Sequence, residues 1–147
     1  MEQCNERPKV SVIIPVYNTC NYVQEALESI CQQTLEELEI IVIDDGSTDC
    51  SRAIVEEIAI KDTRIQVYKQ SNQGLSITRN QGLKFSTGEY IYFMDSDDEI
   101  SFDCISLLMR YMESYRVDFI ASSASVILSD GKREKIGYSS IMHWKSN

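Results

Sequence analysis

The chain has 147 residues, of which 43% are hydrophobic, and 14 basic against 23 acidic side chains give it a net charge of −9. This length suits one domain with a core of ordinary size, and the apolar content argues against intrinsic disorder. The acidic balance excludes a general nucleic-acid binder, which needs a basic surface, and it implies that an anionic ligand would need the help of a cation.

Cysteine spacing and the N-terminus narrow the class further. Five cysteines lie at positions 4, 20, 31, 50 and 104, and no two of them are spaced as CxxC. A zinc site is therefore not expected, and we expect reduced cysteines in a cytoplasmic protein. The N-terminal sequence MEQCNERPK lacks the apolar core of a signal peptide, and no apolar run reaches the ~18 residues of a membrane span.

Apolar periodicity divides the chain into alternating strands and helices. Strands are predicted at Lys9–Asn18, Leu38–Asp45, Arg64–Gln70, Glu89–Asp95 and Val117–Leu128. Helices are predicted around Ala53–Ile58, at Gly74–Ser86, at Ile105–Ser114 and, after the first strand, where one face carries Val23, Ala26, Leu27, Ile30 and Cys31. Ile40–Ile43 and Tyr90–Met94 lack polar alternation, so both strands are expected to be buried. SDGKRE predicts a turn into a hairpin, and the final stretch GYSSIMHWKSN has no clear period.

Alternating strands and helices imply right-handed crossovers and a mostly parallel, Rossmann-like α/β sheet sandwiched by helices. In such sheets, ligands bind beyond the carboxyl ends of the strands. Three predicted strands pass from apolar to polar residues at that edge, in the sequences VIIPVYN, IIVIDDGSTD and YFMDSDD. The residues expected to meet there are Tyr17, Asn18, Asp44, Asp45, Asp95 and Asp97.

The sequence DSDDE, Asp95 to Glu99, places four carboxylates directly after a strand. Asp95 and Asp97 can turn toward a common side, and one or two carboxylates completed by water and phosphate oxygens form the usual shell of Mg²⁺ or Mn²⁺. A cation there would let an acidic protein hold a diphosphate. Alternatively, these acids favour the N-terminus of the next helix, which is the better interpretation for Asp98 and Glu99.

Each remaining candidate also has a structural alternative. Of Asp44 and Asp45, one is expected to cap the turn and the other to face a ligand, because an ionised carboxylate can accept the ring N–H of uracil or a ribose hydroxyl. Tyr17 offers a flat face for a base or simply packs. Arg79 pairs with phosphate or lies at the surface, and His143, the single histidine, is expected to be an exposed bystander.

Five segments, in order, carry a resemblance to a known family: KVSVIIPVYN, ALESICQQT, EIIVIDDGSTD, NQGLSITRNQGL and TGEYIYFMDSDD. Together they resemble the family 2 glycosyltransferases of GT-A fold, from Lys9 to Leu128. The resemblance implies that a sugar is transferred from a nucleotide-sugar donor with inversion at the anomeric carbon.

The same resemblance implies a nucleotide site composed of Pro15, Tyr17, Asn18, Asp44, Asp45, Asn72, Gly74, Arg79, Asp95 and Ser96. In it, Asp45 would hydrogen-bond the base, which suggests a UDP-sugar, and Asp44 would support the turn. Asp95 would approach the ribose or the metal shell, and Asp97 would be the main ligand of Mn²⁺ or Mg²⁺.

The general base of the resembled family lies well beyond the DxD pair, so it is expected beyond Asn147. Asp118 and Asp130 are not placed for that role. We therefore expect residues 1–147 to be one nucleotide-sugar-binding domain, truncated at the C-terminus, with a flexible segment 1–8 and, in 129–147, the start of an incomplete acceptor-side region. The acceptor is expected to be a saccharide or a lipid-linked sugar of polysaccharide biosynthesis, met in the cytoplasm or at the inner face of the membrane.

Other protein classes share parts of this pattern. A phosphoacceptor receiver domain also joins an acidic pair to an α/β sheet, but its pair follows the first strand and here it follows the second. A sugar-phosphate nucleotidyltransferase needs a glycine-rich basic loop, which PVYNTCNY lacks. A silent binding module stays open. No GxGxxG, GxxxxGK[ST] or GxSxG pattern occurs, which argues against dinucleotide oxidoreductases, P-loop nucleotidases and α/β-hydrolases.

Overall fold

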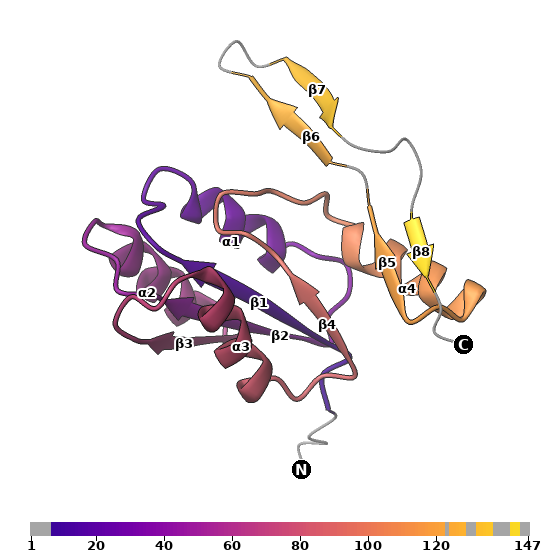
Figure 1. Cartoon of the computed structure of the whole chain (residues 1–147), viewed down its shortest axis with the longest axis horizontal. Helices are drawn as coiled ribbons and strands as arrows, with labels where there is room; N and C mark the ends of the chain where they lie inside the picture. Colours follow the sequence, from indigo (N-terminus) through magenta and orange to yellow (C-terminus); the bar gives the residue numbers. More distant parts are fainter. Residues whose placement is uncertain (1–6, 123, 129–131, 137–141, 145–147) are drawn as a thin grey trace. The chain divides into compact units, whose positions relative to one another are not determined.

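Four parallel strands form the centre of the first part of the chain (Figure 1). The computed structural model describes residues 7–122, 124–128, 132–136 and 142–144, in two compact units, Met1–Phe102 (unit 1) and Asp103–Asn147 (unit 2). The strands of unit 1, in the order β3-β2-β1-β4, are β1 (Val10–Val16), β2 (Leu38–Asp44), β3 (Ile65–Lys69) and β4 (Tyr90–Phe93). Every pairing between them is parallel, which confirms the predicted mostly parallel α/β sheet.

Three helices connect these strands: α1 (Val23–Cys31), α2 (Ser51–Lys61) and α3 (Leu75–Phe85). The chain steps from β1 to β2 to β3 in one direction and then returns to the other side of β1 for β4. Right-handed crossovers therefore place α1 and α2 on one face of the sheet and α3 on the other. This reversal of strand order creates a topological switch point at the carboxyl ends of the neighbouring strands β1 and β4.

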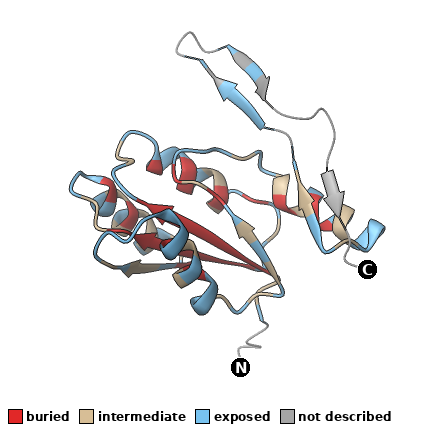
Figure 2. Cartoon of the chain, in the orientation of Figure 1, coloured by how far each residue is buried: buried red, intermediate tan, exposed pale blue. Residues whose placement is uncertain are grey.

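The core of unit 1 lies around β1 and β2, whose residues are all buried (Figure 2). Both strands have a strand on each side and helices on each face, which explains the apolar runs Val12–Ile14 and Ile40–Ile43 within them. On the α3 side, Gly82 allows a close approach, because a Cβ there would collide with the side chain of Ile13. The sheet thus forms a rigid support for the loops at its carboxyl edge.

β4 is an edge strand, so the prediction that Tyr90–Met94 is a buried strand is wrong for most of its length. It pairs only with β1, and Ile91 and Phe93 are 38% and 46% exposed, whereas Met94 is buried. An apolar run does not reveal how many neighbours a strand has, and a strand with one neighbour keeps part of its surface exposed.

In the described part of unit 2 there are one helix and four short strands. The helix α4 (Cys104–Tyr115) confirms the predicted one, and it ends at Arg116, which has a left-handed conformation (φ 51°). The prediction of a single strand over Val117–Leu128 is wrong, since β5 (Phe119–Ala121) pairs antiparallel with β8 (Met142–Trp144), and β6 (Ala124–Ile127) pairs antiparallel with β7 (Arg133–Ile136). The β6–β7 pair confirms the predicted hairpin.

Some predictions fall on residues outside the described ranges. These include residues 1–6 of the predicted flexible N-terminus, the turn at 129–131 with Asp130, much of the predicted acceptor-side region 129–147, and the side chain of His143. They remain predictions.

The cysteines depart from the expectation of an entirely reduced set. Cys20 and Cys50, 30 residues apart, form a disulfide with their Cα atoms 5.3 Å from each other. That Cα separation is within the range a disulfide spans. The parallel pairing of β1 and β2 brings the two following loops together, a juxtaposition that the sequence spacing of cysteines does not reveal. Within the described residues, Cys31 and Cys104 form no disulfide.

Candidate functional site

Loops from several strand ends surround a cavity of about 330 Å³ at the carboxyl edge of the unit 1 sheet. It lies at the β1–β4 switch point, where open parallel sheets bind their ligands. The cavity is lined by Pro15, Val16, Tyr17, Thr19, Asp45, Asn72, Gly74, Leu75, Thr78, Asp95, Ser96 and Asp97. Of the predicted site residues, Asn18, Asp44 and Arg79 do not line it.

A larger cavity of about 590 Å³ lies at the opposite edge of the sheet, where Glu37, Leu38 and Thr87 are among its lining residues. These residues lie at or just before the start of β2 and β4. Because parallel α/β sheets place their ligands at the carboxyl ends of the strands, the smaller cavity is the better candidate despite its size.

The loop after β1 forms the first wall of the cavity. Pro15 is tolerated near the end of this inner strand because the pairing with β4 stops at Ile13. Tyr17 is 49% exposed and is one of the residues that line the cavity. Asn18 has a left-handed conformation (φ 53°), and its Oδ1 accepts the backbone N–H of Thr48 at 2.8 Å. The Asn18 side chain therefore ties this loop to the loop after β2.

Two buried aspartates at the end of β2 make different contacts: Asp44 is the last residue of the strand and Asp45 follows it. Asp44 accepts the backbone N–H of Ser47 at 3.0 Å, which closes the turn after the strand. Asp45 Oδ1 accepts from Gln70 Nε2 at 2.7 Å and from the backbone N–H of Gln73 at 2.9 Å. Its Oδ2 accepts the backbone N–H of Gly74 at 2.9 Å, from a residue whose φ of 87° suits glycine.

Hydrogen bonding controls the charge of Asp45. Burial by itself would raise the pKa of this carboxyl, but the hydrogen bonds from Gln70, Gln73 and Gly74 outweigh it and hold the pKa below its ordinary value. A carboxylate has about four lone pairs, and these bonds use two on Oδ1 and one on Oδ2. Asp45 therefore stays ionised and keeps acceptor capacity on Oδ2.

The loop after β4, residues Asp95–Phe102, is called the acidic loop below. Ser96 is 4% exposed, and its Oγ accepts from Thr19 Oγ1 at 3.0 Å. Asp97 is exposed, and no described residue donates a hydrogen bond to its carboxylate. The pKa of Asp98 is raised, first by burial and then by the negative charges of Asp97 and Asp95. The loop thus gathers carboxylates that repel one another.

Arg79 reaches the acidic loop from α3. Its Nη2 forms an ion pair with Asp95 Oδ1 at 2.5 Å, and its guanidinium lies 6.0 Å from the centre of the Phe93 ring. Its Nε is buried without a hydrogen-bond partner in the described part of the chain. Arg79 therefore acts on the cavity through Asp95. Its two predicted roles, phosphate ligand and surface arginine, both remain predictions.

The donor set of the acidic loop suits a hard divalent cation. Asp97 offers its whole carboxylate and Asp95 offers Oδ2, both oxygen ligands of the kind that Mg²⁺ and Mn²⁺ prefer. Among the described residues, no group of three or more His, Cys, Asp or Glu side chains could hold a metal ion by itself. A cation here would need further oxygens from water or from a phosphate ligand.

Several lining residues were not anticipated: Val16, Thr19, Leu75 and Thr78. Leu75 and Thr78 belong to the first turn of α3, directly after Gly74, and Thr19 follows Tyr17 by two residues. Their closeness in sequence to predicted site residues could have identified these three residues as part of the site. Thr78 is also fully buried, and its Oγ1 accepts from the Gln70 amide that binds Asp45, so it supports the same network.

Comparison with known proteins decides the family. A family profile described as Glycosyl transferase family 2 matches residues 11–145. The chain belongs to this family. It is 44% identical over 110 residues to "Glycosyltransferase GlyA" of Streptococcus pneumoniae. The matched region covers 75% of this chain and 16% of GlyA.

Solved structures agree on the fold. Staphylococcus aureus TarS 1-349 in complex with UDP-GlcNAc matches with a TM-score of 0.70 and 34% identity, over 76% of this chain and 33% of that one. A mannosyltransferase from Pyrobaculum calidifontis in complex with GDP-Man and Mn²⁺ matches with a TM-score of 0.67 and 26% identity, over 74% of this chain and 33% of that one. The expected GT-A fold is confirmed, and the chain spans a third or less of these three proteins.

Proposed function

We propose that this chain is the donor-binding part of an enzyme that transfers a sugar from a nucleoside diphosphate sugar, most simply a UDP-sugar. The observation that carries the proposal is the cavity of about 330 Å³, whose lining includes ionised Asp45 together with Asp95 and Asp97. The similarity of the fold to TarS in complex with UDP-GlcNAc supports a donor of this class. The receiver and nucleotidyltransferase alternatives are not favoured by the family match.

The base of the donor would lie between Tyr17 and Asp45. The half-exposed ring of Tyr17 offers a flat surface on which a base can stack. Asp45 Oδ2 has a lone pair for the ring N–H of a uracil. Because Asp45 is held by backbone N–H groups of Gln73 and Gly74, it would read the base without having to reorganise.

The diphosphate would lie at the acidic loop, where Asp95 and Asp97 would hold Mn²⁺ or Mg²⁺. When bound, the cation would offset the charge of the diphosphate and stabilise the departing nucleoside diphosphate as a Lewis acid. The similarity to a mannosyltransferase in complex with Mn²⁺ supports this assignment. Arg79 would keep Asp95 oriented through their ion pair.

On the acceptor side, we propose a saccharide or lipid-linked hydroxyl that attacks the anomeric carbon with inversion. The new bond from the hydroxyl oxygen forms as the bond to the diphosphate oxygen breaks, and a base takes the hydroxyl proton. We assign that base to no described residue. None of the helices in the described ranges has the length and apolar character needed to cross a membrane.

Calorimetric titration with UDP, in the presence and absence of Mn²⁺, tests the proposal. We expect Mn²⁺ to strengthen UDP binding at least about tenfold, since a charge pair made within the site is worth a few kcal/mol. Asp97→Ala should abolish this gain. Glu99→Gln is the matched control, because it removes an acidic charge from the same loop but not from the cavity lining.

Two results would overturn parts of this account. Tight UDP binding that ignores Mn²⁺ would keep the nucleotide site but remove the metal role of Asp97. A folded chain that binds no nucleotide in either condition would contradict the donor-site assignment itself.

A further inference from the structure

The acidic loop is held by hydrogen bonds from residues that precede α1 in the sequence and from residues that follow it. Before the helix, Thr19 Oγ1 donates to the buried Ser96 Oγ at 3.0 Å, and the Thr19 carbonyl accepts the N–H groups of Tyr22 and Val23 at 2.9 Å each. Thr19 is thereby fixed to the start of the helix and to the loop at once. This contact holds the loop next to Asp97.

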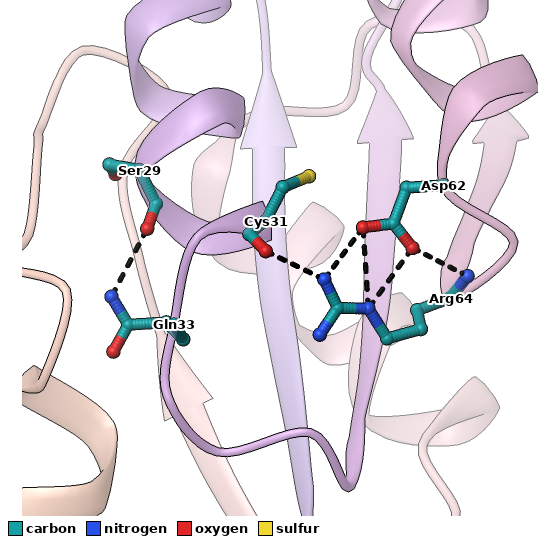
Figure 3. A network of polar contacts seen from close by, with 5 residues as sticks. All are labelled: Ser29, Cys31, Gln33, Asp62 and Arg64. Atoms are coloured by element: carbon teal, nitrogen blue, oxygen red, sulfur yellow. Dashed lines mark hydrogen bonds and ion pairs between the residues drawn. The ribbon is translucent and has the colours of Figure 1, made fainter.

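After the helix, Gln33 makes the second attachment. Its side chain is almost completely buried, at 6% exposure, although glutamine is usually exposed. Gln33 Nε2 donates to the Ser101 carbonyl at 2.7 Å and to the Ser29 carbonyl at 3.1 Å, and Figure 3 shows the bond to Ser29. The amide thus joins the last turn of α1 to a loop residue 68 positions later in the chain.

Two further hydrogen bonds reinforce this attachment. Ser29 Oγ accepts the backbone N–H of Ile100 at 3.3 Å, and the backbone N–H of Thr34 donates to the Phe102 carbonyl at 2.9 Å. The consecutive loop residues Ile100, Ser101 and Phe102 are therefore bound to the last turn of α1 and to the two residues, Gln33 and Thr34, that follow its C-cap. Together with Thr19, these contacts leave the stretch around Asp97 between two fixed points.

We propose that Gln33 is a positioning residue for Asp97, which holds the acidic loop in the shape that directs the carboxylates of Asp95 and Asp97 toward one cation. This inference rests on the donor site proposed above. The loop needs such an attachment, because Asp95, Asp97 and Asp98 repel one another and would otherwise separate. Because the loop is already fixed before the cation binds, binding does not carry the entropy cost of ordering it.

A purely structural role for Gln33 makes a different prediction. In that case Gln33→Met would lower the stability of the whole unit, but the folded molecules would bind UDP and Mn²⁺ as before. The positioning role predicts a selective loss of the Mn²⁺-dependent part of UDP affinity at a temperature where the variant is fully folded. The ratio of UDP dissociation constants without and with Mn²⁺ separates the two roles.

The test uses the complete chain and four proteins: the wild type, Gln33→Met, Ser29→Ala and Gln24→Met. Gln33→Met keeps the length of the side chain and removes both donated bonds, and Ser29→Ala removes the acceptor for Ile100. Gln24→Met is the matched control, because Gln24 is an exposed residue whose side-chain amide donates to Glu28 of the same helix and, among the described residues, to nothing in the acidic loop. Calorimetry with UDP, with and without Mn²⁺, gives the ratio, and circular dichroism gives the folded fraction.

We expect Gln33→Met to reduce the Mn²⁺-dependent gain about three- to tenfold, the effect of losing one or two buried hydrogen bonds from the positioning of the loop. Ser29→Ala should reduce it less and in the same direction, and Gln24→Met should leave it unchanged. If Gln33→Met does not fold, Ser29→Ala decides the question.

The outcomes distinguish this inference from the proposed function. A wild-type gain that Gln33→Met, or Ser29→Ala in its place, fully retains would refute the positioning role alone. A wild type whose UDP affinity ignores Mn²⁺ would refute the metal-assisted donor site, and the inference would fall with it.

Discussion

The three hydrogen bonds that Asp45 accepts make it a strong candidate for a stabilising residue as well as a ligand. Asp45→Asn keeps the shape of the side chain but turns one carboxylate oxygen into an NH₂ group. In either orientation this NH₂ faces an N–H donor, from Gly74 on one side or from Gln70 and Gln73 on the other. At least one charge-assisted bond is lost, and the others become neutral. We expect a cost of about 3 kcal/mol in the free energy of unfolding.

Thermal unfolding followed by circular dichroism measures this effect, and about 3 kcal/mol corresponds to a decrease of about 6–12 °C in Tm for a chain of this size. Asp44→Asn is the matched control: the same substitution in the adjacent buried residue, where the remaining oxygen can still accept the N–H of Ser47. It should lower Tm much less. Equal Tm values for wild type and Asp45→Asn, or a larger decrease for Asp44→Asn, would refute the hydrogen-bond assignment.

Three other predictions concern stability. Hydrogen bonds from Arg64 lower the pKa of Asp62 to about 2, so Asp62 should contribute about 2 kcal/mol above pH 4 and lose that contribution as the pH falls toward 2. The same network includes the Cys31 carbonyl (Figure 3). In urea titrations, the stability difference between wild type and Asp62→Asn should be about half as large at pH 3 as at pH 7, and a constant difference would contradict the role of this pair. The Cys20–Cys50 disulfide closes a loop of 30 residues, so its reduction should lower the free energy of unfolding by about 3–4 kcal/mol in the chain-entropy account. Tm measured with and without reductant tests this, and an unchanged Tm would show that the native protein holds two thiols. Gly82→Ala should cost about 1–3 kcal/mol, because the added methyl group meets the Ile13 side chain, and an unchanged urea midpoint would show that α3 can move away.

The parallel sheet of unit 1 could be predicted from sequence because its signals are local. β2 contains the apolar run Ile40–Ile43, and the helical face predicted around Val23 and Ile30 lies within the observed α1. The exposure of β4 depended instead on how many strands flank it. The short strand β8 had no local period, since pairing with β5 defines it.

The candidate site could be predicted only in outline. Residues at strand ends, such as Tyr17, Asp45 and Asp97, were found because the carboxyl edge of a parallel sheet collects them. Contacts between distant segments were not accessible from sequence. The Arg79–Asp95 ion pair and the burial of Gln33 against the acidic loop arise from the crossovers that bring α3 and α1 beside it.

The most direct test of the central claim is to map UDP binding on the isotope-labelled chain by NMR, with Mg²⁺ as the diamagnetic cation. The account predicts that backbone amide shifts concentrate at Asp45, Gly74 and Asp97, around the cavity at the carboxyl edge of the sheet. Shifts concentrated instead at Glu37, Leu38 and Thr87, around the cavity at the opposite edge, would contradict the donor-site assignment.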